Sequence, residues 1–239
     1  MKLDILAFGA HPDDVELSCS GTLIKHMKMG MKVGVADLTK GELGTRGNAL
    51  IRLKEAETAS KILGLSVRVN LELADGLFET GTEEKVKIIR VIRQFRPRIV
   101  MCNAVSDRHP DHGRAGKLVA DACFLSGLSK FETSDQEGKP QAAWRPSLIL
   151  HYIQDRYLKP GFVIDITDVW DEKMKSIMAF ESQFFNPESK EPDTPISSEF
   201  FLDFIRNRAI EFGRHAGVPY AEGFITESHI KVNSLDNLL

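Results

Sequence analysis

Two short polar segments of this 239-residue chain carry residue types that bind metals and move protons. The first reads His-Pro-Asp-Asp over residues 11–14 and directly follows a short apolar run. The second, over residues 107–112, contains His109 and His112 with an aspartate between them, and it follows another apolar run. Imidazole and carboxylate groups are standard zinc ligands. His11 and Asp14, three residues apart, can therefore converge on one metal ion, and the second segment offers a further metal-competent group.

Each segment on its own also has an ordinary structural explanation. Paired aspartates at a helix start are favoured as N-caps and by the helix dipole. Two histidines three residues apart in a loop are most often surface or capping residues. The two segments together favour a metal site, because each comes directly after a predicted buried strand. A dinucleotide-binding fold would place glycines after the first strand, and two carboxylates there would repel a phosphate.

The elements that must position these segments alternate between strand and helix patterns. Apolar runs predict strands at residues 3–9, 33–38, 67–73 and 98–103, and helical spacing predicts helices at residues 15–29, 50–63, 83–95 and 113–125. This order predicts an α/β, Rossmann-like three-layer sandwich with a mostly parallel sheet. Ligands bind such sheets at the carboxyl ends of the strands. If the first and fourth strands are neighbours, the two polar segments face each other there.

The second half of the chain is less regular. Polar or proline-rich composition predicts loops at residues 130–146 and 186–195. Strands are expected at residues 148–153 and 162–166, helices at residues 169–184 and 198–215, and an extended tail at residues 220–232. Since no long or biased linker separates two parts, we expect a single domain over residues 1–239.

The composition excludes several classes of protein. Lysine and arginine total 31 against 34 acidic residues, a net charge of −3 without a basic block, which argues against a nucleic-acid partner. No apolar run reaches the roughly 18 residues of a transmembrane span, and the first residues lack the pattern of a signal peptide, so no membrane partner is expected. Three scattered cysteines predict reduced thiols in a cytoplasmic protein.

The two polar segments together resemble the paired signature of the PIG-L/LmbE-like zinc-dependent N-acetylglucosamine deacetylases. The resemblance covers nearly the whole chain, because residues 41–47 with Arg52 and Glu55 resemble the family's loop and helix after the second strand. Residues 181–184 and 220–224 are similar to the branch of the family that makes bacillithiol. One departure is Val15, which stands before Glu16 where the family often has a glutamate directly after the aspartates; related deacetylases share this variation.

The resemblance implies a hydrolase that removes acetate from an N-acetylglucosamine conjugate, and the branch implies N-acetylglucosaminyl malate as that substrate. It also implies a Zn²⁺ ion bound by His11, Asp14 and His112, with one position open for water. Fe²⁺ is an alternative, because imidazole and carboxylate suit both metals. Relatives further suggest a homo-oligomer, either a trimer or a hexamer.

The remaining site residues receive roles by the same resemblance. Asp13 would be the general base, His109 as imidazolium would stabilise the oxyanion, and Asp111 would orient His109. A plain turn aspartate is the alternative for Asp111. Arg52 resembles a family arginine that grips the substrate, with an exposed helix charge as the alternative. Arg108 could meet a malate carboxylate through its bidentate fork.

Other functions stay open from the sequence. The chain could deacetylate a different N-acetylated sugar. A metallo-phosphoesterase would normally need two metals and more ligands than the two segments supply. A metal-binding module without catalysis would have no use for the spare carboxylate of Asp13 beside a three-ligand metal.

Overall fold

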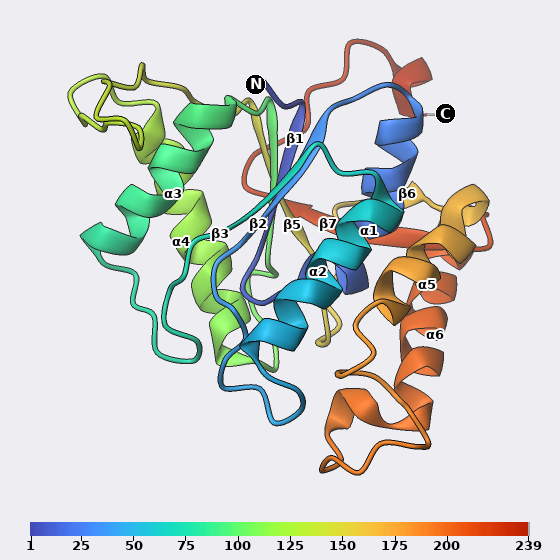
Figure 1. Ribbon diagram of the computed structural model, residues 1–239. Helices are drawn as coiled ribbons and strands as arrows, with labels where there is room; N and C mark the ends of the chain where they lie inside the picture. Colours follow the sequence, from blue (N-terminus) through green and yellow to red (C-terminus); the bar gives the residue numbers. More distant parts are fainter. Residues whose placement is uncertain (239) are drawn as a thin grey trace.

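The computed structural model describes residues 1–238 and is built on a seven-stranded sheet with the order β3-β2-β1-β4-β5-β7-β6 (Figure 1). Strands β1 to β5 are parallel, whereas β7 runs antiparallel to both β5 and β6. The strands are β1 (Ile5–Gly9), β2 (Val33–Asp37), β3 (Val67–Asn70), β4 (Ile99–Cys102), β5 (Leu148–Tyr152), β6 (Phe162–Asp165) and β7 (Ala221–Thr226). The predicted mostly parallel sheet is confirmed.

Helices cover both faces of this sheet, because alternate residues of the buried strands point to opposite sides. In β1, Leu6 and Phe8 join the apolar core beneath α3 and α4, while Ile5 and Ala7 join the core beneath α1. Helices α2 and α5 pack beside α1, and α6 lies against β7 and β6. The helices are α1 (Asp14–Lys28), α2 (Ala49–Leu63), α3 (Thr82–Phe95), α4 (Pro110–Ser126), α5 (Trp170–Met178) and α6 (Glu199–Ala216).

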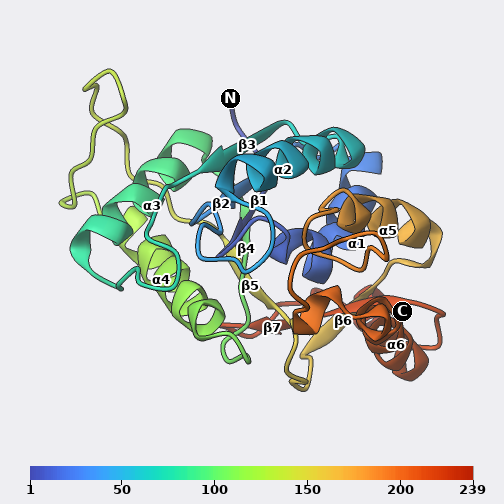
Figure 2. The same ribbon diagram turned by 60° about the horizontal axis from the view of Figure 1, so that its bottom comes forward.

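Strand β1 lies between β2 and β4, so the chain changes direction across the sheet at this point. The connection after β1 and the connection after β4 therefore leave the same edge side by side (Figure 2). The condition that the first and fourth strands are neighbours is therefore met. This adjacency positions the two polar segments opposite each other, at the edge where open α/β sheets bind ligands.

The helix predicted over residues 169–184 was wrong at its end, because α5 stops at Met178. The chain then turns so that Phe180 and Phe184 both become buried against α2. Glu55 of α2 accepts hydrogen bonds from the Ser182 backbone N–H and hydroxyl, at 2.7 and 2.8 Å. These long-range contacts replace the helical bonds that the local sequence favours.

The three cysteines are all free and buried. Within residues 1–238, no helix is long and apolar enough to cross a membrane.

Candidate active site

The first polar segment makes a tight turn between β1 and α1. An added Cβ atom at Gly9 would lie only 2.9 Å from the carbonyl oxygen of His11, so the turn requires glycine there. Asp13 adopts a φ of 114°, a backbone conformation that costs a non-glycine residue about 1–3 kcal/mol. Asp14 begins α1, and its Oδ2 accepts a hydrogen bond from the His11 backbone N–H at 3.0 Å. The turn thereby directs the Asp13 and Asp14 side chains to different partners.

The second polar segment links β4 to α4. His109 caps α4, with its Nδ1 accepting the Asp111 backbone N–H at 3.3 Å, and Pro110 occupies the first helical position. His112 follows in the first helical turn. The ring centroids of His11, His109 and His112 lie between 4.7 and 5.6 Å from one another. The two segments, almost a hundred residues apart, thus meet as expected.

The side chains predicted as metal ligands converge on the carboxylate of Asp14. Its Oδ1 lies 3.1 Å from His112 Nε2, and its Oδ2 lies 3.7 Å from His11 Nδ1. Asn103 Nδ2 and Gln154 Nε2 donate to the same carboxylate at 2.9 and 3.1 Å. Burial alone would raise the pKa of Asp14, but the contacts with His112 and His11 outweigh it and hold the pKa well below its usual range. The site therefore favours positive charge at this point.

Each of these two histidines is held by carboxylates on its other ring nitrogen. His112 Nδ1 lies 2.5 Å from Asp107 Oδ2, while His11 Nε2 lies 3.0 Å from Asp75 Oδ1 and 3.3 Å from Asp111 Oδ2. Burial opposes protonation, yet the carboxylates raise the pKa of His11 to about 10 and that of His112 to about 9. Metal-binding histidines are commonly oriented in this way.

The donor set of this site fits a divalent metal. His11, Asp14 and His112 offer two imidazoles and one carboxylate, the ligand types of zinc and ferrous iron. His109 adds a third imidazole, since ring nitrogens of His11, His109 and His112 lie within 4.8 Å of one another. His11 also meets Asp75 and Asp111 within the same limit.

Asp13 and Arg52 form a buried ion pair beside this donor set. Arg52 Nη2 donates to Asp13 Oδ2 at 2.6 Å, and both side chains are almost fully enclosed. Arg52 is only 7% exposed, so the alternative of an exposed helix charge was wrong. Burial raises the pKa of Asp13 to about 6, against the opposing effect of the Arg52 charge. A carboxylate with a pKa near neutrality is suited to proton transfer.

The second segment arranges its other residues differently from the prediction. The Asp111 carboxylate faces His11 at 3.3 Å, accepts the Gly76 backbone N–H at 2.8 Å and pairs with Arg114 at 2.9 Å. Asp111 therefore contacts His109 through its backbone N–H, and the ring that its carboxylate orients is that of His11. Burial, followed by the charges of His11 and His112, lowers the pKa of His109, and its Nδ1 accepts an N–H. The predicted imidazolium form was therefore wrong, and the ring is neutral with its other nitrogen free to donate.

A polar cleft opens over these residues. We use this name for the cavity whose lining includes Asp13, Arg46, Arg52, Asp75 and His109. Arg108 stands at its rim beside His112, half-exposed, and its Nε lies 3.2 Å from Asp155 Oδ2.

Two carboxylates at the site had no predicted role, although the sequence carries a signal for each. Asp75 follows the third strand, at the sheet edge where the other polar segments end. Asp107 belongs to the second polar segment, and it lies five residues before His112. Both positions could have been found by the same reasoning about strand ends.

Comparison with known proteins gives consistent similarities. Residues 6–123 match the PIG-L family, described as GlcNAc-PI de-N-acetylase. The chain is 31% identical over 229 residues to diacetylchitobiose deacetylase of Thermococcus kodakarensis, covering 92% of this chain and 81% of the relative. It is 27% identical over 202 residues to a probable N-acetyl-alpha-D-glucosaminyl L-malate deacetylase 2 of Bacillus cereus, covering 77% and 84% respectively.

A solved structure is also similar over almost the whole chain. It is that of N,N'-diacetylchitobiose deacetylase from Pyrococcus horikoshii in complex with an inhibitor. The TM-score is 0.81 at 28% identity, with 98% of this chain and 88% of the other covered. The sheet and its flanking helices are therefore shared with that enzyme.

Proposed function

This chain belongs to the PIG-L family, and from that premise we propose that it is a metal-dependent hydrolase that removes acetate from an N-acetylglucosamine conjugate. One observation carries the proposal: His11 and His112 face the carboxylate of Asp14, while Asp13 lies beside them and is held by Arg52. A metal-binding module would need His11, Asp14 and His112 as ligands, but it would not need the additional buried carboxylate of Asp13. A deacetylase needs both.

The proposed ligands are His11 through Nδ1, Asp14 through its carboxylate and His112 through Nε2, because the other ring nitrogens are engaged by carboxylates. We propose Zn²⁺ as the ion. When bound, a divalent metal supplies Lewis-acid chemistry, polarising the amide carbonyl and acidifying water. The family membership and the donor types support this assignment.

The proton transfers are assigned to Asp13. It accepts a proton as the water oxygen bonds to the amide carbon, and it returns that proton to the nitrogen as the C–N bond breaks. The second proton of the water also passes to the amine, so the products are acetate and a protonated primary amine, and atoms and charge balance. Arg52 fixes the orientation of the Asp13 carboxylate through their 2.6 Å contact. His109, next to His11 and His112, is proposed to donate a hydrogen bond to the developing oxyanion.

For the substrate we propose N-acetylglucosaminyl malate. The likeness of residues 181–184 and 220–224 to the bacillithiol branch and the similarity to the malate deacetylase of Bacillus cereus support it. Arg108, at the rim of the cleft, is the proposed partner of a malate carboxylate. Diacetylchitobiose is the second candidate, favoured by the similarity to the enzyme of Thermococcus kodakarensis.

Primary-amine release tests the proposal with three sugars: N-acetylglucosaminyl malate, diacetylchitobiose and plain N-acetylglucosamine. One charge-assisted hydrogen bond contributes about 1.5–3 kcal/mol, so kcat/KM for the malate conjugate should exceed that for the plain sugar by at least about tenfold. A chelator should abolish turnover, and added Zn²⁺ should restore it. Preference for diacetylchitobiose would overturn the malate assignment alone, whereas no amine from any sugar would overturn the deacetylase.

A further inference from the structure

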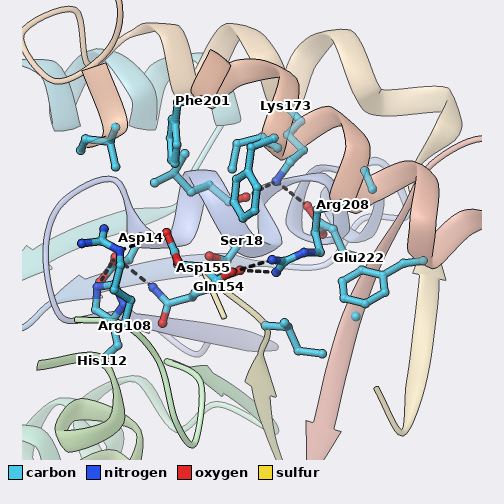
Figure 3. A pocket seen from close by; sticks show the side chains of 18 of the residues that line it. Asp14, Ser18, Arg108, His112, Gln154, Asp155, Lys173, Phe201, Arg208 and Glu222 are labelled. Carbon is cyan, nitrogen blue, oxygen red and sulfur yellow. Dashed lines mark hydrogen bonds and ion pairs between the residues drawn. The ribbon is translucent and has the colours of Figure 1, made fainter. Parts of the chain in front are cut away.

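A second cavity adjoins the catalytic centre on the side of α6, and we call it the α6 cavity (Figure 3). The lining residues that it shares with the polar cleft are Asp14, Leu17, Arg108, His112 and Ile196, so the two hollows meet at the proposed metal ligands. Figure 3 shows Asp14 and His112 at one end and Phe201 projecting toward the space from α6. Its apolar walls are formed by Leu17, Ile196, Phe201, Phe204, Ile205 and Phe212.

Apart from the proposed metal ligands and the partly exposed Arg108–Asp155 pair, the charged groups in the walls of the α6 cavity are paired and buried within the protein. Lys173 Nζ lies 2.8 Å from Glu222 Oε1, and this buried pair also bonds backbone groups of α1 on both sides. The guanidinium of Arg208 donates to the carbonyl oxygens of Gln154 and Asp155. These groups therefore have little capacity left for a ligand. What the cavity offers to a ligand is chiefly aromatic and aliphatic surface.

The polar cleft on the other side of the metal ligands has the opposite character, with Asp13, Arg46, Arg52 and Asp75 in its lining. An N-acyl sugar has the same division, because the amide separates a hydroxyl-rich ring from a hydrocarbon chain. If the amide lies at Asp14, the hydroxyl-rich sugar ring can occupy the polar cleft. The hydrocarbon chain of the acyl group can then occupy the apolar α6 cavity. The methyl group of an acetyl amide is short and would leave most of the α6 cavity unfilled.

We propose that the α6 cavity is an acyl-chain binding site, so that the enzyme removes longer N-acyl groups as well as acetyl. This inference rests on the proposed function and specifies the acyl part of its substrate class. The chemistry is unchanged, since water still cleaves the amide and releases a carboxylate and a primary amine. Each methylene moved from water into an apolar site is worth up to about fourfold in kcat/KM.

The test uses one glucosamine glycoside carrying N-acetyl, N-butyryl or N-hexanoyl groups, with amine release as the readout. In the wild-type protein, kcat/KM should rise with chain length, by at least about tenfold from acetyl to hexanoyl if half of the added methylene area is buried. A parallel series of N-acetylglucosamine glycosides with apolar aglycones should show no such rise. If the aglycone series responds and the acyl series does not, the acyl assignment is overturned.

Substitutions in α6 test whether the dependence of kcat/KM on acyl-chain length arises in the α6 cavity. Ala209 is buried and lines the cavity, so Ala209→Phe should fill it and lower the hexanoyl-to-acetyl ratio of kcat/KM by about tenfold while acetyl turnover persists. The neighbouring Ile210 is 39% exposed and lies outside the lining, so Ile210→Phe is the matched control and should leave the ratio unchanged. Ile205→Ala enlarges the cavity and should raise the hexanoyl-to-acetyl ratio of kcat/KM. This second variant keeps the test possible if Ala209→Phe fails to fold.

The possible outcomes separate this inference from the proposed function. Acetyl turnover with rejection of butyryl and hexanoyl groups would overturn the acyl-chain site and leave the deacetylase intact. A hexanoyl preference that neither Ala209→Phe nor Ile205→Ala changes would also overturn it. Calorimetry with the N-hexanoyl glycoside and metal-loaded Asp13→Asn adds a readout that does not need turnover. Binding that is no tighter than for the N-acetyl glycoside would contradict the proposal.

Discussion

Replacing Lys173 with methionine should lower the free energy of unfolding by about 3–5 kcal/mol, the usual cost of leaving a buried charge without its partner. Lys173 is 2% exposed, and its Nζ donates to Glu222 at 2.8 Å and to the carbonyl oxygens of Glu16 and Leu17 at 3.0 and 2.9 Å. The variant removes all three bonds. It also leaves the Glu222 carboxylate, 4% exposed, without its cation.

The magnitude depends on burial, and the residue next to Lys173 in α5 supplies a matched control, because Glu172 also forms an ion pair but near the surface. Lys28 of α1 and Glu172 of α5 also form an ion pair, at 2.7 Å, but their side chains are 50% and 42% exposed. Solvent screens that pair, so Lys28→Met should cost at most about 1 kcal/mol. The two ion pairs have nearly equal distances, so distance alone would predict equal losses of unfolding free energy. Because only one pair is buried, we expect the two losses to differ by several-fold.

Urea unfolding followed by circular dichroism measures both variants, with the midpoint compared at constant m-value. The double variant Lys173→Met with Glu222→Gln should cost less than the sum of its parts by about 1–3 kcal/mol, since it removes both buried charges together. A Lys173→Met loss no larger than that of Lys28→Met would refute the reasoning. Additive single losses would show that the two side chains act independently.

Further predictions concern the proposed chemistry. His112→Ala should keep the fold by circular dichroism but lose most bound metal; near-normal metal content would contradict its role as a ligand. Asp13→Asn should keep its metal while turnover falls by about 10²–10⁴, and metal loss would instead make Asp13 a ligand. Asp107→Asn should weaken metal affinity by about 10–100-fold in chelator competition, because His112 loses its orienting carboxylate, and unchanged affinity would argue against that role. Arg108→Ala should narrow the preference for the malate conjugate over the plain sugar; an unchanged ratio would mean that other residues hold the malate.

Much of the fold could be predicted from the sequence because the buried strands are short continuous apolar runs with helical segments between them. That pattern leaves few alternatives to a parallel sheet with helices on both faces. Within such a sheet, a strand order with β1 next to β4 is one of the possibilities. The structure has this order, and it brings His11 close to His112. The end of α5 could not be predicted in this way, because Glu55 and the buried Phe180 act from outside the segment.

The burial of Arg52 had a signal in the sequence. Arg52 stands at helical spacing with Ala56, Ala59 and Leu63, which form the buried face of α2. A charge on an apolar face needs a buried partner, and Asp13 supplies it. The Asp111 contact with His11 had no such signal, because it depends on how α4 approaches the β1 edge. The homo-oligomer and the cytoplasmic location stay predictions.

Asp13 and Asp14 are chemically identical neighbours, and the structure gives them different environments. The turn with φ of 114° at Asp13 directs one carboxylate to Arg52 and the other to His112 and His11. Burial raises the pKa of Asp13 to about 6 despite Arg52, whereas two imidazoles hold the pKa of Asp14 well below its usual range. A carboxylate that stays ionised suits a cation, and one near neutrality suits proton transfer. The strained turn thus separates the two proposed roles, at a cost that the Arg52 contact helps to offset.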